Sequence, residues 1–291
     1  EEVVVTNQPI NGLLKAAVDA SQKRFEKSIL LNTYYREFAK INGNYLKFAD
    51  GLLDYYIKRK SGAADLYIQQ SRAKQLIPNG QPVFKKFKYT KDDNNTDLAA
   101  AMNVYDVRDA ISDASNFKGV KSILDDKRYD YELKLRKNSN GKDLEIVKVT
   151  PKPEMHELLL EGHVTYEADT KLIVEIELKT AESHKQYSEM INVLLFKFKI
   201  NHLGKKVGFR TDNGKYIMAY SQNRSSFYIQ NKKQFDDTWD FMSDVIKKVN
   251  LSLTRRKNTR TKTCSRQATI SHQNTGKQVI CCYSPGRKKE F

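Results

Sequence analysis

Short segments in which apolar and polar residues alternate recur along most of the chain, and turn-forming residues separate many of them. Such alternation places the apolar side chains on one face of a strand. The run Ile41-Asn42-Gly43-Asn44 predicts a hairpin turn between strands at 31–40 and 45–57, because Asn and Gly tolerate a positive φ. The pattern therefore restricts the fold to a mostly antiparallel sheet.

Further strands are expected at 66–73, 83–89, 129–136, 144–150, 158–167, 171–179, 190–202, 206–211, 215–220 and 227–230. The periodicity of residues 237–250 is mixed and predicts neither a strand nor a helix. Two segments show the spacing of an amphipathic helix: residues 10–27, and an insertion near residues 97–114. The expected fold class is α+β and mostly antiparallel β, with a curled sheet or half-barrel packed around a helix.

The basic character of the chain is concentrated at its end. Residues 251–291 contain ten Lys or Arg and one acid, so they carry +9 of the net charge of +16. All three cysteines, Cys264, Cys281 and Cys282, also lie there. Clustered basic residues suggest nucleic-acid binding. Since this segment holds most of the charge, the charge itself gives little reason to expect that function for the body of the chain.

Beyond Leu253 the periodicity stops, and residues 254–291 are expected to form a basic tail that is disordered or non-native. Codon degeneracy allows a peptide with balanced charge and more aromatic residues if this tail is read two nucleotides on. A frameshift is therefore one hypothesis, and the nucleotide sequence of the gene tests it. Residues 10–253 form the expected β-rich domain, and residues 1–9 a linker or the end of a preceding β-sandwich.

Several motifs resemble a family of Bacteroidetes envelope proteins that carry a carboxypeptidase-regulatory-like domain. Tyr34-Tyr35-Arg36-Glu37 is similar to a strand signature of that family, in the region that follows the domain. Gly162-His163-Val164-Thr165-Tyr166, with Asp169-Thr170, is similar to a strand–turn–strand of the same region. Asn213-Gly214-Lys215-Tyr216 is similar to a later hairpin. The family also tends to end on Tyr-Trp, which this chain lacks.

The resemblance implies export to the periplasm or outer membrane, with a signal peptide and a sandwich domain upstream. It implies a binding or structural module without enzymatic activity or cofactor. An envelope partner or a lipid-like ligand is then the expected partner, and the association with the membrane would be peripheral. No apolar run approaches the ~20 residues of a membrane-spanning helix.

Tyr35, Arg36 and Glu37 form the one candidate site. Arg36 and Glu37 point to opposite faces of a strand, and an unpaired buried charge is costly. The first interpretation is a structural ion pair, and the alternative is an Arg36 that contacts a ligand in the concavity of the sheet. Neither catalytic residues nor cofactor or metal ligands are predicted.

The remaining polar motifs favour structural roles. His156 and His163 are seven residues apart and flank a strand, unlike the i, i+4 spacing of a helical zinc site. Glu175 and Glu177 share one strand face opposite apolar residues, which is typical of solvated surface. Ser183-His184 lacks the context of a nucleophile elbow. A hydrolase would need His156, His163 or Glu175 to meet in a buried cluster.

A nucleic-acid-binding protein is the alternative function. In residues 84–89 and 196–199, Phe or Tyr alternates with Lys, as in proteins that stack bases and track the phosphate backbone. In the second segment the alternation also describes an amphipathic strand, with Phe196 and Phe198 on one face. That simpler interpretation is preferred.

Overall fold

The computed structural model describes residues 2–3, 8–57, 64–75, 116–137, 140–193, 196–231, 235–247, 268–271 and 279–282. Its helices are α1 (Ile10–Arg24), α5 (Lys118–Lys121) and the 3-10 helix η1 (Glu182–Tyr187). Its first strands are β1 (Glu2–Val3), β2 (Leu30–Ile41), β3 (Asn44–Ile57), β4 (Ala64–Gln75), β5 (Tyr129–Lys137), β6 (Asp143–Pro151) and β7 (Leu160–Glu167). The later ones are β8 (Ile173–Thr180), β9 (Ile191–Val193), β10 (Phe196–Asp212), β11 (Lys215–Asn231), β12 (Phe235–Lys247), β13 (Ala268–Ser271) and β14 (Val279–Cys282).

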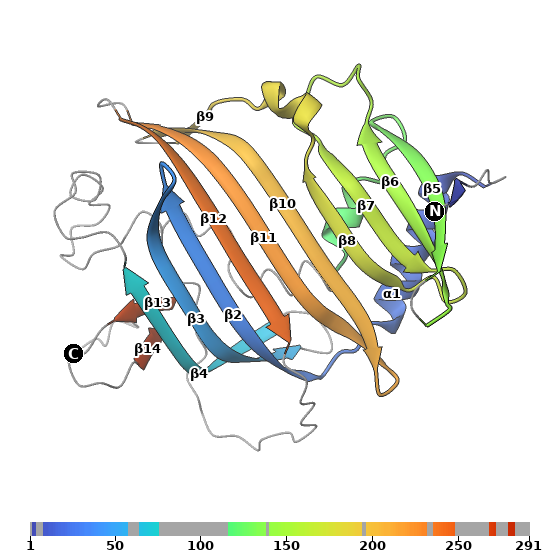
Figure 1. Cartoon of the computed structure of the whole chain (residues 1–291), viewed down its shortest axis with the longest axis horizontal. Coiled ribbons are helices and arrows are strands. Elements are labelled where there is room, and N and C mark those ends of the chain that lie inside the picture. The colour runs from blue at the N-terminus through green and yellow to red at the C-terminus, as the bar shows by residue number, and fades with distance from the viewer. Residues whose placement is uncertain are drawn as a thin grey trace, which may run out of the picture.

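Twelve of these strands form one antiparallel sheet that is not closed into a barrel. Along the sheet the strand order is β1-β5-β6-β7-β8-β10-β11-β12-β2-β3-β4, and β9 pairs with the start of β10. The strand β12 lies beside β2, so distant parts of the chain meet in the middle of the sheet, with Phe241 opposite Ala39. Bulges interrupt several pairs, among them β10–β11 and β2–β3. Bulges bend strands and increase their twist, which accounts for the curl of the sheet (Figure 1).

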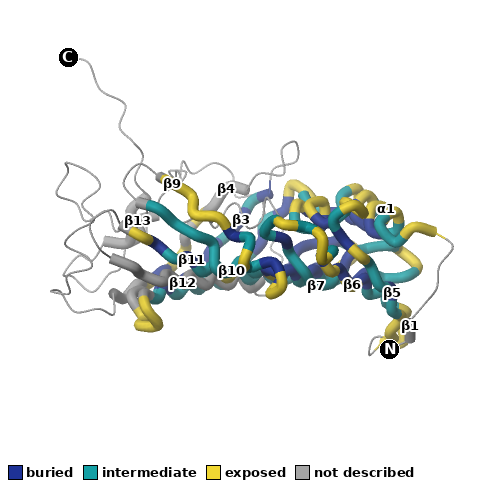
Figure 2. The backbone as a smooth tube through the Cα atoms, turned by 90° about the horizontal axis from the view of Figure 1, so that it is seen from above, coloured by how far each residue is buried: buried dark blue, intermediate teal, exposed yellow. Residues whose placement is uncertain are grey.

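Helix α1 packs against the concave face of the sheet near one end. Leu14, Ala17, Val18 and Ser21 are its buried residues, at the i, i+3, i+4, i+7 spacing of one helix face. The helix contacts β5, β8 and the short α5. In Figure 2 the buried residues gather between α1 and the strands beneath it. The expected sheet curled around a helix is confirmed.

Aromatic side chains fix α1 and α5 to the sheet. The Phe209 ring on β10 stacks on Phe117 at 5.0 Å and on Tyr216 at 5.6 Å between centroids. Phe25, just after α1, meets Phe209 edge-on at 6.3 Å. A buried hydrogen bond also joins α1 to β8, because Ser21 Oγ accepts from the Ile173 amide at 2.9 Å. This half of the concave face is therefore filled by bulky side chains.

The expected hairpins are confirmed, but two predicted breaks are wrong. In the first hairpin Asn42 and Gly43 have φ values of 48° and 80°, as its tight turn requires. The predicted strands at 190–202 and 206–211 are instead the short β9 and the continuous β10, which passes through Gly204. The predicted strands at 215–220 and 227–230 are one continuous strand, β11.

Two further segments differ from the sequence-based picture. Residues 237–250, left without a prediction, contain most of β12. In the tail, where no regular structure is expected, β13 pairs with β14, with Ala268 opposite Cys282. The predicted strand at 83–89 and the helical insertion near 97–114 lie outside the described residues. The division into a domain at 10–253 and a tail at 254–291 stays a prediction.

Candidate functional site

The concave face beyond α1 has a floor of small side chains. Strands β2, β3, β4 and β11 contribute buried residues there whose side chains are short or absent, namely Thr33, Ala39, Ala49, Gly51, Ser71 and Ser221. We call these six residues the small-residue floor. Register places them on the concave face: Thr33 pairs with Leu53 of the core, Gly51 pairs with Ser71, and Ser221 pairs with Val207 of the core. Among the described helices, α1 and α5 contact strands of the other half.

Short side chains keep this floor close to the backbone of the strands. In the half beneath α1, by contrast, the rings of Phe209, Tyr216 and Tyr166 fill the space between sheet and helix. All six residues of the floor are buried, and their short side chains take up little of the space above the strands. The floor is thus the strongest candidate for a binding surface in the described part of the chain.

The predicted site residues Tyr35, Arg36 and Glu37 divide between the two faces of β2. Tyr35 packs against the core on the concave face, and its hydroxyl donates to the Glu37 carboxylate. The Arg36 guanidinium lies on the outer face, 5.5 Å from the centroid of the Phe38 ring. The structure thus places Arg36 away from the concavity and keeps Tyr35 and Glu37 in it. Whether any of the three contacts a ligand stays a prediction.

The sequence analysis did not predict an ion pair on the outer face, between Asp50 and Arg72. The Asp50 side chain is 7% exposed and accepts two hydrogen bonds from Arg72, at 2.6 and 2.7 Å. Tyr34 donates a third at 3.0 Å. Arg72 holds the pKa of Asp50 below its ordinary value, against the opposing effect of burial. Arg72 lies 22 residues away, so only the pairing of β3 with β4 could reveal this partner.

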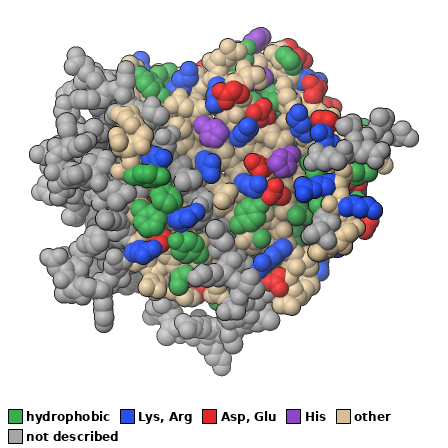
Figure 3. Space-filling view, viewed as in Figure 1, with side chains coloured by type: hydrophobic (Ala, Val, Ile, Leu, Met, Phe, Trp, Pro, Cys, Tyr) green, Lys and Arg blue, Asp and Glu red, His purple; other side chains and the backbone are tan. Residues whose placement is uncertain are grey.

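A second network on the outer face joins β7, β8, β10 and β11. Glu175 accepts from His163 Nε2 at 3.4 Å, from Lys206 Nζ at 3.3 Å and from the Tyr220 hydroxyl. Lys206 also donates to Glu177 at 2.6 Å. Figure 3 views the outer face, where histidine, acidic and basic side chains mingle. The two carboxylates lie on the outer face, as expected, but Glu175 is engaged with neighbours and is 27% exposed.

This network has the residue types of a metal site, but Lys206 already supplies a cation. Ligand atoms of His163, Glu175 and Glu177 lie within 4.8 Å of one another. The Lys206 ammonium lies close to both carboxylates, so a divalent ion would have to displace it. We interpret the network as a structural cross-link between four strands.

The network is also poorly suited to acid–base catalysis at neutral pH. The hydrogen bond from His163, and then those from Tyr220 and Lys206, holds the pKa of Glu175 at about 2, against the opposing effect of burial. Burial and the neighbouring Glu175 raise the pKa of the Tyr220 hydroxyl far above its ordinary value. An efficient proton donor or acceptor has a pKa near the working pH. His156 lies apart from this network, where its ring meets Tyr187 at 5.1 Å.

The lowered pKa of Glu175 predicts an acid-sensitive contribution to stability. The ionised carboxylate favours the folded state above the ordinary value of 4.5, and this benefit is lost as the pH falls towards 2. Urea unfolding should show that Glu175→Gln loses roughly 2 kcal/mol at pH 7, after allowance for screening, and less at pH 2.5. A difference in unfolding free energy between the wild type and Glu175→Gln that stays constant with pH would contradict this expectation. Glu182→Gln, at an exposed ion pair with Lys185, is the control and should change little.

Ser183 and His184 make a local contact on η1. Ser183 Oγ lies 2.9 Å from His184 Nδ1, and His184 Nε2 lies 3.3 Å from the Lys152 carbonyl. The carbonyl can only accept, so Nε2 carries a proton, and in the neutral imidazole Nδ1 then accepts from Ser183. His184 is 2% exposed and adjacent in sequence to its serine. We interpret the contact as one that satisfies a buried histidine.

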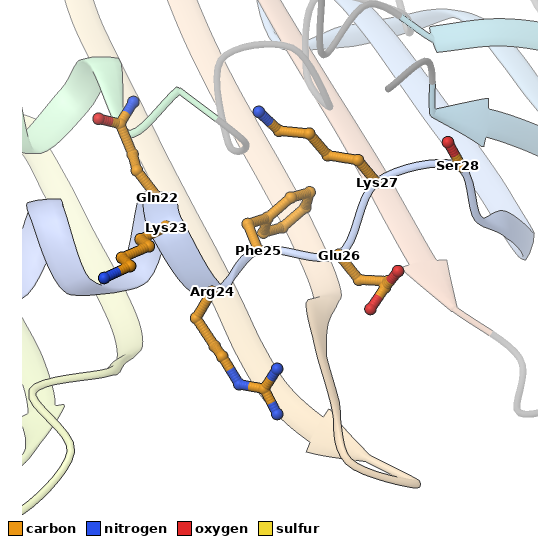
Figure 4. A pocket seen from close by; sticks show the side chains of 7 residues that line it. All are labelled: Gln22, Lys23, Arg24, Phe25, Glu26, Lys27 and Ser28. Carbon is orange, nitrogen blue, oxygen red and sulfur yellow. The ribbon is translucent and has the colours of Figure 1, made fainter. Parts of the chain in front are cut away.

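An open hollow of about 600 Å³ lies along the segment that joins α1 to β2. Its lining residues run consecutively from Gln22 to Ser28 (Figure 4). The segment is held in place by its own bonds: Arg24 donates to the Gly214 carbonyl at 2.6 Å, and the Glu26 amide donates to the Tyr216 carbonyl at 2.8 Å. Within the part of the chain that the structure describes, the hollow is a surface feature lined by this connection alone.

The protein is an open, curled antiparallel sheet with a helix on part of its concave face, and the candidate site lies on the rest of that face. No family model matches the chain, and no curated protein matches its sequence. A solved structure titled for lipid–protein interactions in lipovitellin matches 80% of this chain, at 11% identity and a TM-score of 0.29. This chain spans 27% of that lipovitellin chain.

Two bacterial structures match in the same way. A DUF1329 family protein from Desulfovibrio piger covers 82% of this chain and is itself covered to 95%, at 13% identity and a TM-score of 0.27. A LolA superfamily protein from Nitrosomonas europaea covers 81%, is itself covered to 94%, and has 7% identity and a TM-score of 0.24. All three TM-scores lie below 0.5, so these likenesses carry no functional argument.

Proposed function

We propose that this protein is a non-enzymatic binding module of the cell envelope that holds an apolar, lipid-like ligand on the concave face of its sheet. The small-residue floor is the observation that carries the proposal. The buried core residues Leu31, Leu53 and Tyr55, and Tyr35 packed against the core, make the same face of β2 and β3 apolar. A concave, mostly apolar surface is the usual setting of a small-molecule site.

The place of this module in the cell belongs to the same proposal. The motifs around Tyr34–Glu37 and Gly162–Tyr166 support membership of the carboxypeptidase-regulatory-like-domain family, and with it the periplasm or outer membrane. Among the described helices, none is long and apolar enough to cross a membrane.

Binding of a neutral fluorescent probe, N-phenyl-1-naphthylamine, and its displacement by dodecanol test the proposal. Ala49→Leu adds volume to the floor and should weaken probe binding about tenfold or more, which corresponds to ~1.4 kcal/mol. Ser226→Leu adds the same side chain to β11 on the outer face and should leave the affinity unchanged. Urea unfolding confirms that both variants fold. Failure of the wild-type chain to bind the probe, or equal affinity in both variants, would refute the proposal.

The described residues favour this function over nucleic-acid binding. Phe198 packs edge-on against Phe227 at 6.1 Å between ring centroids, on the concave face of β10 and β11. Alternation turns Lys197 and Lys199 to the opposite face, so this segment is the amphipathic strand that the simpler interpretation expects. The other aromatic–basic segment, 84–89, lies outside the described residues. A salt-dependent affinity for DNA that survives truncation after Leu253 would favour the alternative.

A further inference from the structure

The middle of β11 is unusually polar for a strand inside a wide sheet. Residues 221–226 read Ser-Gln-Asn-Arg-Ser-Ser, and the strand continues through them between β10 and β12 without a register shift. On the concave face this segment presents Ser221, Asn223 and Ser225, opposite Val207, Lys205 and Leu203 of β10. Segments whose residues do not suit the secondary structure they form tend to have a functional role.

Two of these side chains bury a hydrogen-bond donor that makes no hydrogen bond within the described ranges. Ser221 is 0% exposed, and within the described part of the chain its Oγ makes no hydrogen bond. Nδ2 of Asn223 is likewise buried and makes none among the described residues. Native proteins pair nearly all such groups, because a buried donor has lost its hydrogen bonds to water. The two residues are two apart on one strand face, so their Cα atoms lie about 7 Å apart.

Lys205 completes a cluster in which every group can donate. It lies directly opposite Asn223 on β10, and the pairing places both on the concave face. A hydroxyl, an amide NH₂ and an ammonium together suit a group with several acceptor oxygens and a negative charge. We call Ser221, Asn223 and Lys205 the donor cluster.

Apolar residues follow the donor cluster along the same two strands. Beyond Leu203 and Ser225, the concave face of β10 and β11 presents Ile200 and Phe198 opposite Phe227 and Ile229. Phe227 and Ile229 are each 2% exposed, whereas Phe198 and Ile200 are half-buried. The face thus passes from donors to hydrocarbon within about 10–15 Å, at 3.3–3.4 Å per residue. Hydrogen-bond donors followed by apolar side chains match the polar head and the hydrocarbon chain of a single-chain amphiphile.

We propose that the donor cluster binds the anionic head group, carboxylate or phosphate, of a single-chain amphiphile whose hydrocarbon chain lies against Phe198 and Ile200. The inference rests on the proposed function and specifies its ligand class. The head group supplies the acceptors that Ser221 and Asn223 require, and Lys205 adds a positive charge on the same face. Ser221 belongs to the small-residue floor as well, and the other five floor residues lie on β2, β3 and β4, beyond β12 on the same face.

Three ligands with the same chain and different heads test the inference. Dodecanoate and dodecyl phosphate below their micellar concentrations, and dodecanol below its solubility limit, are titrated against the probe bound to the full chain. At least one anion should displace the probe at a concentration tenfold or more below that of dodecanol, and the stronger anion identifies the head group. Ser221→Ala and Asn223→Ala should each weaken the anion about five- to tenfold and leave dodecanol unchanged. Ser225→Ala, on the same face of the same strand, is the matched control and should change neither.

The outcomes separate this inference from the proposed function. If dodecanol displaces the probe as well as both anions do, the head-group site is refuted and the apolar site stands. If no ligand displaces the probe and calorimetry detects no binding of dodecanoate, both are refuted. Unfolding of the ligand-free protein gives a second readout: an unpartnered hydroxyl contributes no hydrogen bond, so Ser221→Ala should not lower the unfolding midpoint. A clear loss of stability would assign Ser221 to the fold and overturn its role as a ligand donor.

Discussion

Replacing Gly162 with alanine is expected to cost at least about 3 kcal/mol of folding free energy, or to prevent folding. The backbone at Gly162 has a φ of 152°, which side chains other than glycine rarely adopt. A Cβ atom there would lie 1.9 Å from the carbonyl oxygen of Glu177 on the paired strand β8. The obstacle is backbone, so no rotation of a side chain can relieve it. Urea unfolding followed by circular dichroism measures the loss.

The same substitution at Gly12 should have the opposite sign. Gly12 lies in the first turn of α1, and a Cβ there meets nothing within 4 Å. Because glycine is a poor helix former, Gly12→Ala should stabilise the protein by about 0.5–1 kcal/mol. Comparable unfolding midpoints for the two variants would show that the close approach of β7 and β8 is not rigid.

Replacing Phe209 with alanine is expected to cost about 3–5 kcal/mol. The ring is 4% exposed and lies among Phe25, Phe117 and Tyr216, so its removal leaves a cavity where α1 and α5 meet the sheet. Unfolding in guanidinium chloride should show a lower midpoint and, for a two-state transition, an unchanged slope.

Two further variants serve as comparisons for Phe209→Ala. Phe209→Leu retains much of the apolar volume and should lose roughly half as much. Phe198→Ala, on the same strand but half-buried, should cost about 1–2 kcal/mol, because less surface leaves water there. An equal effect at Phe198 and Phe209 would contradict the view that most of the buried core lies in the helix-covered half.

Local patterns predicted most of the individual elements. The Asn42-Gly43 turn, the amphipathic stripe of α1 and the alternation in β5 to β8 depend on residues close together in the chain, so a single sequence reveals them. The strand β12 and the central part of β11 were missed for the opposite reason. Their residues do not alternate cleanly, and their strand conformation is stabilised by hydrogen bonds to neighbours on both sides.

The candidate sites show the same division. The predicted trio Tyr35, Arg36 and Glu37 was correctly expected to point to both faces of a strand, but the sequence could not say which face is concave. Ser221 and Asn223 were overlooked because a polar run resembles a loop until flanking strands enclose it. The only hint of these two residues in the sequence was the break predicted between the strands at 215–220 and 227–230.

By itself, the sequence determined that this chain forms an antiparallel sheet with a helix near its beginning, since hydrophobic period and turn chemistry are local properties. Only the tertiary structure decided that β12 joins β2, that the sheet stays open and curls, and that α1 covers one half of its concave face. Those outcomes depend on pairing between residues up to about 200 positions apart, such as Phe241 with Ala39. Pairing at such distances is chosen by the total burial and hydrogen bonding of the whole sheet, which no local pattern encodes.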